Sequence, residues 1–86
     1  MLRKALSHGN LDDRCVCIDG KKLKTIRYQK LLTQAQLVER SDVSMGTIGA
    51  CERKYTRKVS LNVVKLLAEA LEIDPKELYT AFWNQT

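Results

Sequence analysis

The sequence predicts a small all-α fold, in which five short helices follow an N-terminal arm or one short strand. The chain has 86 residues, enough for one domain and too few for a two-domain enzyme. Hydrophobic residues make up 44% and charged residues 29% of it, with only four Gly and one Pro, as is typical of folded globular domains. Apolar residues recur at helical spacing, and residues that can cap a helix precede each of these stretches in the sequence. We expect the arm over residues 1–19 and the helical domain over residues 20–86.

The arm leads into the first predicted helix. Within the arm only the run Cys15-Val16-Cys17-Ile18 has the composition of a short strand. Asp19 can then cap a helix from about residue 21 to residue 30, which no Gly or Pro interrupts. This helix would bury Leu23 and Ile26.

Two short helices are predicted in the middle of the chain. Thr33-Gln34-Ala35-Gln36 has the pattern of a capping box, in which the side chains of Thr33 and Gln36 each accept from the other residue's backbone amide. This signal opens a helix over about residues 34–41. Ser44 is a second candidate N-cap, and the helix after it, over about residues 45–53, would bury Ile48 and Cys51.

Two further helices are predicted toward the C-terminus, after a polar basic connection over residues 54–59. Ser60 can cap a helix that buries Leu61, Val64, Leu67, Ala68 and Leu71. Asp74, with Pro75 behind it, can cap a fifth helix that carries an apolar stripe of Leu78, Tyr79, Phe82 and Trp83. Part of this stripe would close the core, and Tyr79, Phe82 and Trp83 would supply the contact of a homodimer.

Positive charge is concentrated in the middle of the chain. The net charge is +5, yet residues 21–58 contain ten Lys and Arg against three acids, and residues 59–86 contain two Lys against four acids. Such segregation indicates binding to a polyanion, and a solvated basic surface would give the same count. Charge alone leaves these two interpretations open.

The two central helices have the length and apolar spacing of a helix-turn-helix. From about Val16 to Tyr79 the sequence resembles the lambda-repressor-like helix-turn-helix domains of the Cro and phage-repressor type, also called the xenobiotic-response-element class. The residues that carry the resemblance are Leu23, Ile26-Arg27, Leu32-Thr33-Gln34, Leu37, Val43-Ser44, Thr47-Ile48, Glu52-Arg53, Ser60-Leu61 and Leu67-Ala68-Glu69-Ala70-Leu71.

The resemblance implies a transcriptional regulator that binds double-stranded DNA as a homodimer, with modest sequence specificity. It implies a structural ion pair between Arg27 and Glu52, which would tie the first helix to the recognition helix. The positions implied to face DNA bases are Ser44, Met45, Gly46, Gly49, Ala50 and Arg53. Those implied to contact phosphates are Gln34, Thr47, Lys54, Tyr55, Arg57 and Lys58.

The sequence also departs from the family pattern. Leu31 and Asp42 stand where Gly is usual, Val38 stands where Ala is usual, and Cys51 replaces a larger residue. Of the residues implied to face bases, only Ser44 and Arg53 have polar reach, whereas base reading normally uses Arg, Lys, Asn or Gln. The alternative function is therefore a helix-turn-helix scaffold that acts mainly as a protein-interaction module or as the partner of another regulator.

Other classes of function have less support. The one His, His8, lies in the arm without an evident catalytic partner, so we expect no enzyme. Cys15, Cys17 and His8 could supply three metal ligands, but we expect Cys-x-Cys to place its thiols on opposite sides of an extended chain, and the usual two-residue spacer is missing. We expect no metal and no cofactor. Three Cys, no leader and no apolar run near ~20 residues predict a cytoplasmic protein with no membrane contact.

Overall fold

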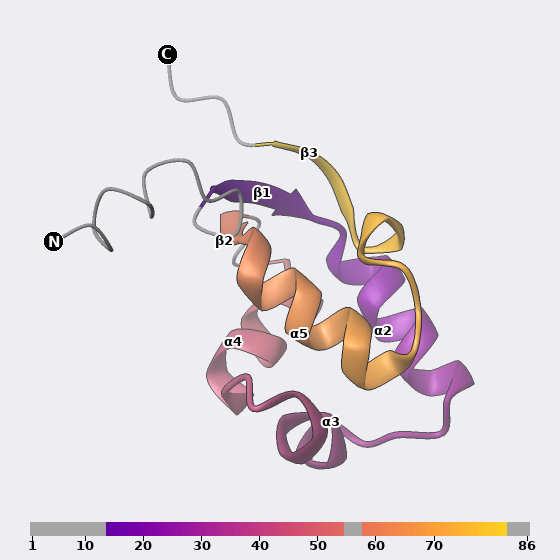
Figure 1. Ribbon diagram of the computed structural model, residues 1–86. Helices are drawn as coiled ribbons and strands as arrows, with labels where there is room; N and C mark the ends of the chain where they lie inside the picture. Colours follow the sequence, from indigo (N-terminus) through magenta and orange to yellow (C-terminus); the bar gives the residue numbers. More distant parts are fainter. Residues whose placement is uncertain (1–13, 55–57, 83–86) are drawn as a thin grey trace, which may run out of the picture.

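Four α-helices, a short 3₁₀ helix and a three-stranded antiparallel sheet make up the part of the chain that the computed structural model describes, residues 14–54 and 58–82 (Figure 1). In Figure 1, α5 crosses the centre of the view, α3 and α4 lie below it, and the sheet lies above it. In chain order the elements are β1 (Cys15–Ile18), α2 (Gly20–Gln29), α3 (Gln34–Ser41), α4 (Met45–Glu52), β2 (Lys58–Ser60), α5 (Leu61–Leu71), the 3₁₀ helix η2 (Pro75–Glu77) and β3 (Tyr79–Phe82).

The starts of the four α-helices confirm the predicted caps. The side chains of Asp19, Ser44 and Ser60 each accept a hydrogen bond from the backbone amide three residues ahead. Thr33 and Gln36 form the complete capping box. Because short polar side chains satisfy amides that a helix leaves without partners, the sequence located these starts within one residue.

Each of the same four helices is followed by a residue in the left-handed backbone conformation. Leu31, Asp42, Lys54 and Glu72 have φ of 59°, 65°, 65° and 60°, and none of them is a Gly. At Leu31 the turn is a Schellman motif, in which the amides of Leu31 and Leu32 donate to the carbonyls of Tyr28 and Arg27. Two of these positions, Leu31 and Asp42, are the ones at which the family pattern has Gly.

The sheet corrects the predicted all-α class. β1 lies between β2 and β3 in the order β2-β1-β3, with both pairings antiparallel. A single strand would leave its backbone amides and carbonyls without partners. The one predicted strand therefore needed neighbouring strands, which hydrophobic periodicity did not reveal. β2 lies in the segment predicted as a loop, and β3 lies in the segment predicted as a fifth helix.

The predicted fifth helix is wrong beyond its first turn. Asp74 caps η2 as expected, but Leu78 is completely buried and its carbonyl accepts from the amide of Asp19 at 2.7 Å. The chain then extends along β1, where its aromatic and β-branched residues suit a strand. Tyr79 and Phe82 are therefore not part of a helical stripe, and Trp83 lies outside the described residues.

The two thiols of β1 lie on the same face of the sheet, contrary to the expectation of opposite sides. Val16 and Ile18 are buried while Cys15 and Cys17 are half-buried, because side chains alternate along a strand with a period of two. Both are free thiols.

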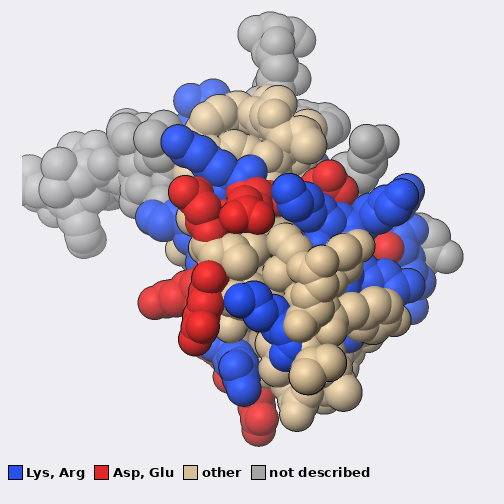
Figure 2. Space-filling view, turned by 90° about the vertical axis from the view of Figure 1, so that its right-hand side faces the viewer, with Lys and Arg blue, Asp and Glu red and all other residues tan. Residues whose placement is uncertain are grey.

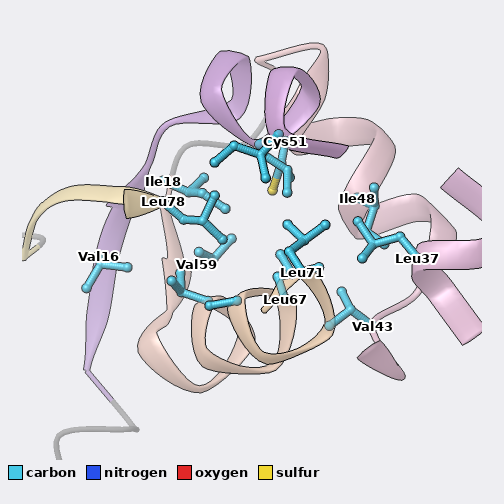
Figure 3. Packing of buried hydrophobic residues seen from close by; sticks show 14 of the residues in the cluster. Val16, Ile18, Leu37, Val43, Ile48, Cys51, Val59, Leu67, Leu71 and Leu78 are labelled. Carbon is cyan, nitrogen blue, oxygen red and sulfur yellow. The ribbon is translucent and has the colours of Figure 1, made fainter. Parts of the chain in front are cut away.

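The core joins the sheet to the helices (Figure 3). Side chains from all the α-helices and from β1 and β2 converge on Leu67 and Leu71 of α5, with Leu78 closing the sheet end. Cys51 points into this cluster, where burial, followed by the charge of Glu52, raises the pKa of its thiol. Val38 packs partly buried against the core, so its extra carbons relative to Ala are accommodated.

Candidate nucleic-acid interface

Arg27 and Glu52 form a bidentate ion pair between α2 and the end of α4. Nε of Arg27 donates to Oε2 of Glu52 at 2.7 Å, and Nη2 donates to Oε1 at 2.8 Å. The two side chains are only 5% and 2% exposed. Two parallel charge-assisted hydrogen bonds fix the direction of both side chains, so α4 is held against α2 in one orientation.

The same pair fixes the start of α3. Nη1 of Arg27 donates to the carbonyl of Leu32 at 2.8 Å, and Nε2 of Gln34 donates to Oε1 of Glu52 at 3.0 Å. The first residue of α3 is thereby bound to the last residue of α4. We call Arg27, Gln34 and Glu52 the buried polar network.

The network also sets the protonation of its carboxylate. Burial alone would raise the pKa of Glu52, but hydrogen bonds from Arg27 and Gln34, with the charges of Arg27 and Lys24, outweigh burial and hold that pKa below its ordinary value. The hydrogen bond to Glu52 correspondingly raises the pKa of Arg27. Both groups are therefore charged at neutral pH.

Gly20 is a positioning residue that sequence reasoning missed. A Cβ at this position would overlap the carbonyl oxygen of Cys51, so the start of α2 approaches the end of α4 more closely than any other residue type permits. The signal available in the sequence was a Gly directly after the helix cap Asp19, at a position where Gly is not needed for the cap itself.

The start of α3 presents several hydrogen-bond donors. Its first two backbone amides, those of Gln34 and Ala35, have no acceptor within the helix. Gln34 uses one hydrogen of its side-chain amide on Glu52 and has a second one to donate. These donors lie at the positive end of the helix dipole, which favours an anionic oxygen.

α4 buries one face and exposes the other. Ile48, Cys51 and Glu52 are buried, and on the opposite side Ser44, Met45, Gly46 and Arg53 are exposed. Thr47 and Ala50 are half-buried. Met45 is 45% exposed, and a Cβ at Gly46 would meet no atom within 4 Å. The exposed face of α4 therefore carries little side-chain bulk.

The hydroxyls at the start of α4 bind each other. Oγ of Ser44 donates to Oγ1 of Thr47 at 2.9 Å and accepts from the amide of Thr47 at 3.2 Å. Ser44 is thereby occupied by its cap, whereas the hydroxyl of Thr47 accepts in this pair and keeps its hydrogen to donate to an acceptor outside the protein.

Gly49 is buried, unlike its neighbours in the predicted base-facing set. A Cβ at Gly49 would lie 3.2 Å from Nη2 of Arg53, so the guanidinium of Arg53 covers this position. The remaining predicted base-facing residues, Ser44, Met45, Gly46, Ala50 and Arg53, lie together on α4 and directly beside it.

Cationic residues follow α4 directly. Lys54 is exposed behind the helix, and Lys58 is exposed at the start of β2. Tyr55 and Arg57, also predicted to contact phosphates, lie outside the described residues. On the face in Figure 2 most acidic side chains gather on the left and the largest group of Lys and Arg lies on the right. α5 and the segment after it carry the acids Glu69, Glu72, Asp74 and Glu77.

Within residues 14–54 and 58–82, no group of three or more His, Cys, Asp or Glu side chains could hold a metal ion. None of the helices in these two ranges combines the length and the apolar character needed to cross a membrane. His8, the third candidate metal ligand of the sequence, lies outside them.

Solved structures of other proteins share this arrangement. The restriction-modification controller protein C.AhdI from Aeromonas hydrophila is 36% identical over 67% of this chain and 86% of its own, with a TM-score of 0.63. The master regulator for biofilm formation SinR, solved in complex with DNA, shares the fold with a TM-score of 0.64 at 20% identity over 65% of this chain and 89% of its own. The controller protein C.Esp1396I gives 0.59 at 25% identity, over 64% and 69%.

A comparison with family models identifies the family of this chain. No curated protein matches it significantly. A family model described as helix-turn-helix matches residues 23–78, which include most of α2, the two motif helices, β2, α5 and η2. The matched residues include the buried polar network and all of α3 and α4. Together with the structural likeness to C.AhdI, this match shows that the chain belongs to the Cro/C1-type helix-turn-helix family.

Proposed function

We propose that this protein is a transcriptional regulator that binds double-stranded DNA through α3 and α4. The observation that carries the proposal is the buried polar network, which holds the donors at the start of α3 beside the exposed face of α4. The identity with C.AhdI, a restriction-modification controller protein, and the likeness in fold to SinR, solved in complex with DNA, support it.

In this docking α4 enters the major groove and the start of α3 meets the DNA backbone. The amides of Gln34 and Ala35, the second hydrogen of the Gln34 side chain and the hydroxyl of Thr47 donate to phosphate oxygens. Lys54, Tyr55, Arg57 and Lys58 continue the contact along the backbone.

Base reading is the smaller part of the interaction. Ser44 is occupied by Thr47, and Met45, Gly46 and Ala50 offer only apolar contact, as with thymine methyl groups. Arg53 is the only cationic residue of the segment 44–53 and the main candidate for hydrogen bonds to a base. We therefore infer modest sequence specificity on top of strong phosphate binding.

The test is the salt dependence of binding to a duplex of random sequence, measured by fluorescence anisotropy between about 50 and 200 mM salt. Each phosphate contact contributes about 0.9 to the slope of log K against log salt, so Lys54→Ala with Lys58→Ala should flatten the slope by roughly two units. The matched control is Lys65→Ala with Lys76→Ala, which removes the same formal charge from α5 and η2. This control should change the slope much less.

Two results would contradict the proposal. Equal flattening by both double variants would mean that net charge, rather than this surface, attracts DNA. A wild-type chain without measurable duplex binding would leave the scaffold that acts through protein partners as the function.

We further infer that the protein is a homodimer joined through the outer edge of β3. β3 lies at the edge of the described sheet, and residues 78–86 contain no charged side chain, so two copies with net charge +5 each can approach there. Phe82 is 38% exposed at this edge, beneath the guanidinium of Arg14 and 5.8 Å from the ring of Tyr79. Antiparallel pairing of two identical edge strands is compatible with a two-fold axis.

Sedimentation of the intact chain tests the dimer. Ala81→Lys places two like charges close together across the paired edges, and Trp83→Ala removes an aromatic residue that follows β3; both should shift the equilibrium toward monomer. Thermal melting of each variant checks that the fold is retained. A wild-type chain that sediments as a monomer at tens of micromolar, or an Ala81→Lys variant as dimeric as the wild type, would exclude the β3 edge.

A further inference from the structure

The exposed face of α4 has no polar side chain near its middle. At its start Ser44 and Thr47 bind each other, which leaves the hydroxyl hydrogen of Thr47 for the DNA backbone, and at its end Arg53 follows the last helical residue. Met45, Gly46, Gly49 and Ala50 lie between them. A hydrogen bond to a base from the centre of this helix must therefore come from a side chain that reaches there from elsewhere.

The guanidinium of Arg53 reaches this place. A Cβ at Gly49 would lie 3.2 Å from Nη2 and 3.7 Å from Cζ of Arg53. Side chains on a helix lean toward its N-terminus, so a long side chain at position 53 covers the turn that contains residue 49. The missing side chain of Gly49 is what provides the space.

We propose that Gly49 is a positioning residue for sequence recognition, because its lack of a Cβ lets the Arg53 guanidinium lie across the middle of α4 and bind guanine in the major groove. The planar guanidinium can donate two hydrogen bonds to O6 and N7 of guanine. This inference rests on the proposed DNA binding, and it adds the base that is read and the residue that sets the geometry of reading.

Gly46 is a natural control for Gly49. Both glycines lie in α4 and both weaken that helix relative to Ala. A Cβ at Gly46 meets no atom within 4 Å, whereas a Cβ at Gly49 meets only the far end of a flexible side chain. Either position therefore accepts Ala without disturbing the core, and only the change at Gly49 moves Arg53.

The experiment is selection from a pool of duplexes with randomised sequence, followed by sequencing of the bound fraction. The chains compared are the wild type, Gly46→Ala, Gly49→Ala, Arg53→Ala and the double variant Gly49→Ala with Arg53→Ala. Wild type and Gly46→Ala should enrich the same sequences, including one guanine position. Arg53→Ala should lower the preference at that position by about 5- to 150-fold.

Gly49→Ala should lower the preference at the same position by about 2- to 12-fold, as expected when one of two hydrogen bonds is lost. In the Arg53→Ala background the same change should have no further effect, because Gly49 acts through Arg53. Both Gly variants should melt higher than the wild type, by roughly 4–8 °C, so lost preference cannot come from unfolding.

The outcomes separate this inference from the proposed function. The proposed role of Gly49 is wrong if the Gly49→Ala variant selects the same sequences as the wild type. It is also wrong if Gly49→Ala lowers the guanine preference as much in the Arg53→Ala background as in the wild type. Salt-dependent DNA binding stands in both cases. If the wild type binds duplex but enriches no guanine position, base reading by Arg53 is overturned. If it binds no duplex, the proposed function fails.

Discussion

Glu52 of α4 accepts three hydrogen bonds, two from Arg27 of α2 and one from Gln34 of α3, so this carboxylate connects the three helices. Glu52→Gln would remove the negative charge and turn an amide hydrogen toward the donors of Arg27. Because a buried cation would then lack its counter-charge, we expect a loss of about 3–5 kcal/mol in the free energy of unfolding. Urea unfolding measures this loss, and a loss below about 1 kcal/mol, the value of a surface pair, would contradict a buried ion pair between Arg27 and Glu52.

The lowered pKa of Glu52 gives stability a definite dependence on pH. A carboxyl whose pKa is lower in the folded state stabilises the fold above its unfolded pKa of about 4.3, and this contribution is lost as pH falls through the folded pKa. The difference in stability between wild type and Glu52→Gln should therefore narrow on acidification, since protonated Glu52 resembles Gln. A difference that stays constant from neutral pH down to about pH 2 would rule out the ionised pair as its source.

At the scale of elements, each of the four α-helices is followed within two residues by a left-handed residue with a side chain, which costs about 1–2 kcal/mol relative to Gly. Removing the side chain of Leu31 costs little burial of apolar surface, because this residue is 87% exposed. We expect Leu31→Gly to stabilise the protein by about 0.5–1 kcal/mol after the greater entropy of Gly in the unfolded chain is subtracted.

The neighbouring Lys30 is the matched control for Leu31→Gly. Lys30 is also exposed, but its φ is −88°, so Lys30→Gly gains no relief of strain and should destabilise. Urea unfolding of both variants provides the comparison. Equal effects at the two positions would mean that the left-handed backbone of Leu31 carries no strain.

The helix starts could be predicted from the sequence, whereas β2 and β3 could not. The starts of α2, α3, α4 and α5 depend on a polar cap and the residues just behind it, which a single sequence displays. β2 and β3 depend on pairing with β1 across most of the chain, and a local pattern contains no such information. Asp74 and Pro75 do start a helical turn, but after Leu78 the chain extends and forms hydrogen bonds with β1 instead of continuing as a helix.

At the scale of the whole molecule, positive charge is concentrated in residues 21–58 of the sequence, and on the face in Figure 2 most acidic side chains and the largest group of Lys and Arg lie on different sides. The interface that the sequence predicts on α3 and α4 rests on the helix-turn-helix spacing of residues 34–53 rather than on charge alone. Sequence reasoning could not foresee that Ser44 would be occupied by Thr47, that Gly49 would be covered by Arg53, or that Gly20 would allow α2 to approach α4. These features depend on side-chain directions and on contacts between elements, which composition and spacing do not fix.

We claim that DNA docks on α3 and α4, and an amide-resolved NMR titration of the isotope-labelled chain with a DNA duplex tests this claim most directly. The largest shifts should then occur at the amides of Gln34 and Ala35 and along residues 44–50, where donors without an acceptor in the helix and the exposed face of α4 lie. Amides of α5 and η2, on the acidic side of the molecule, should move little. Shifts centred on α5 or on the sheet, with α3 and α4 unchanged, would contradict the claim.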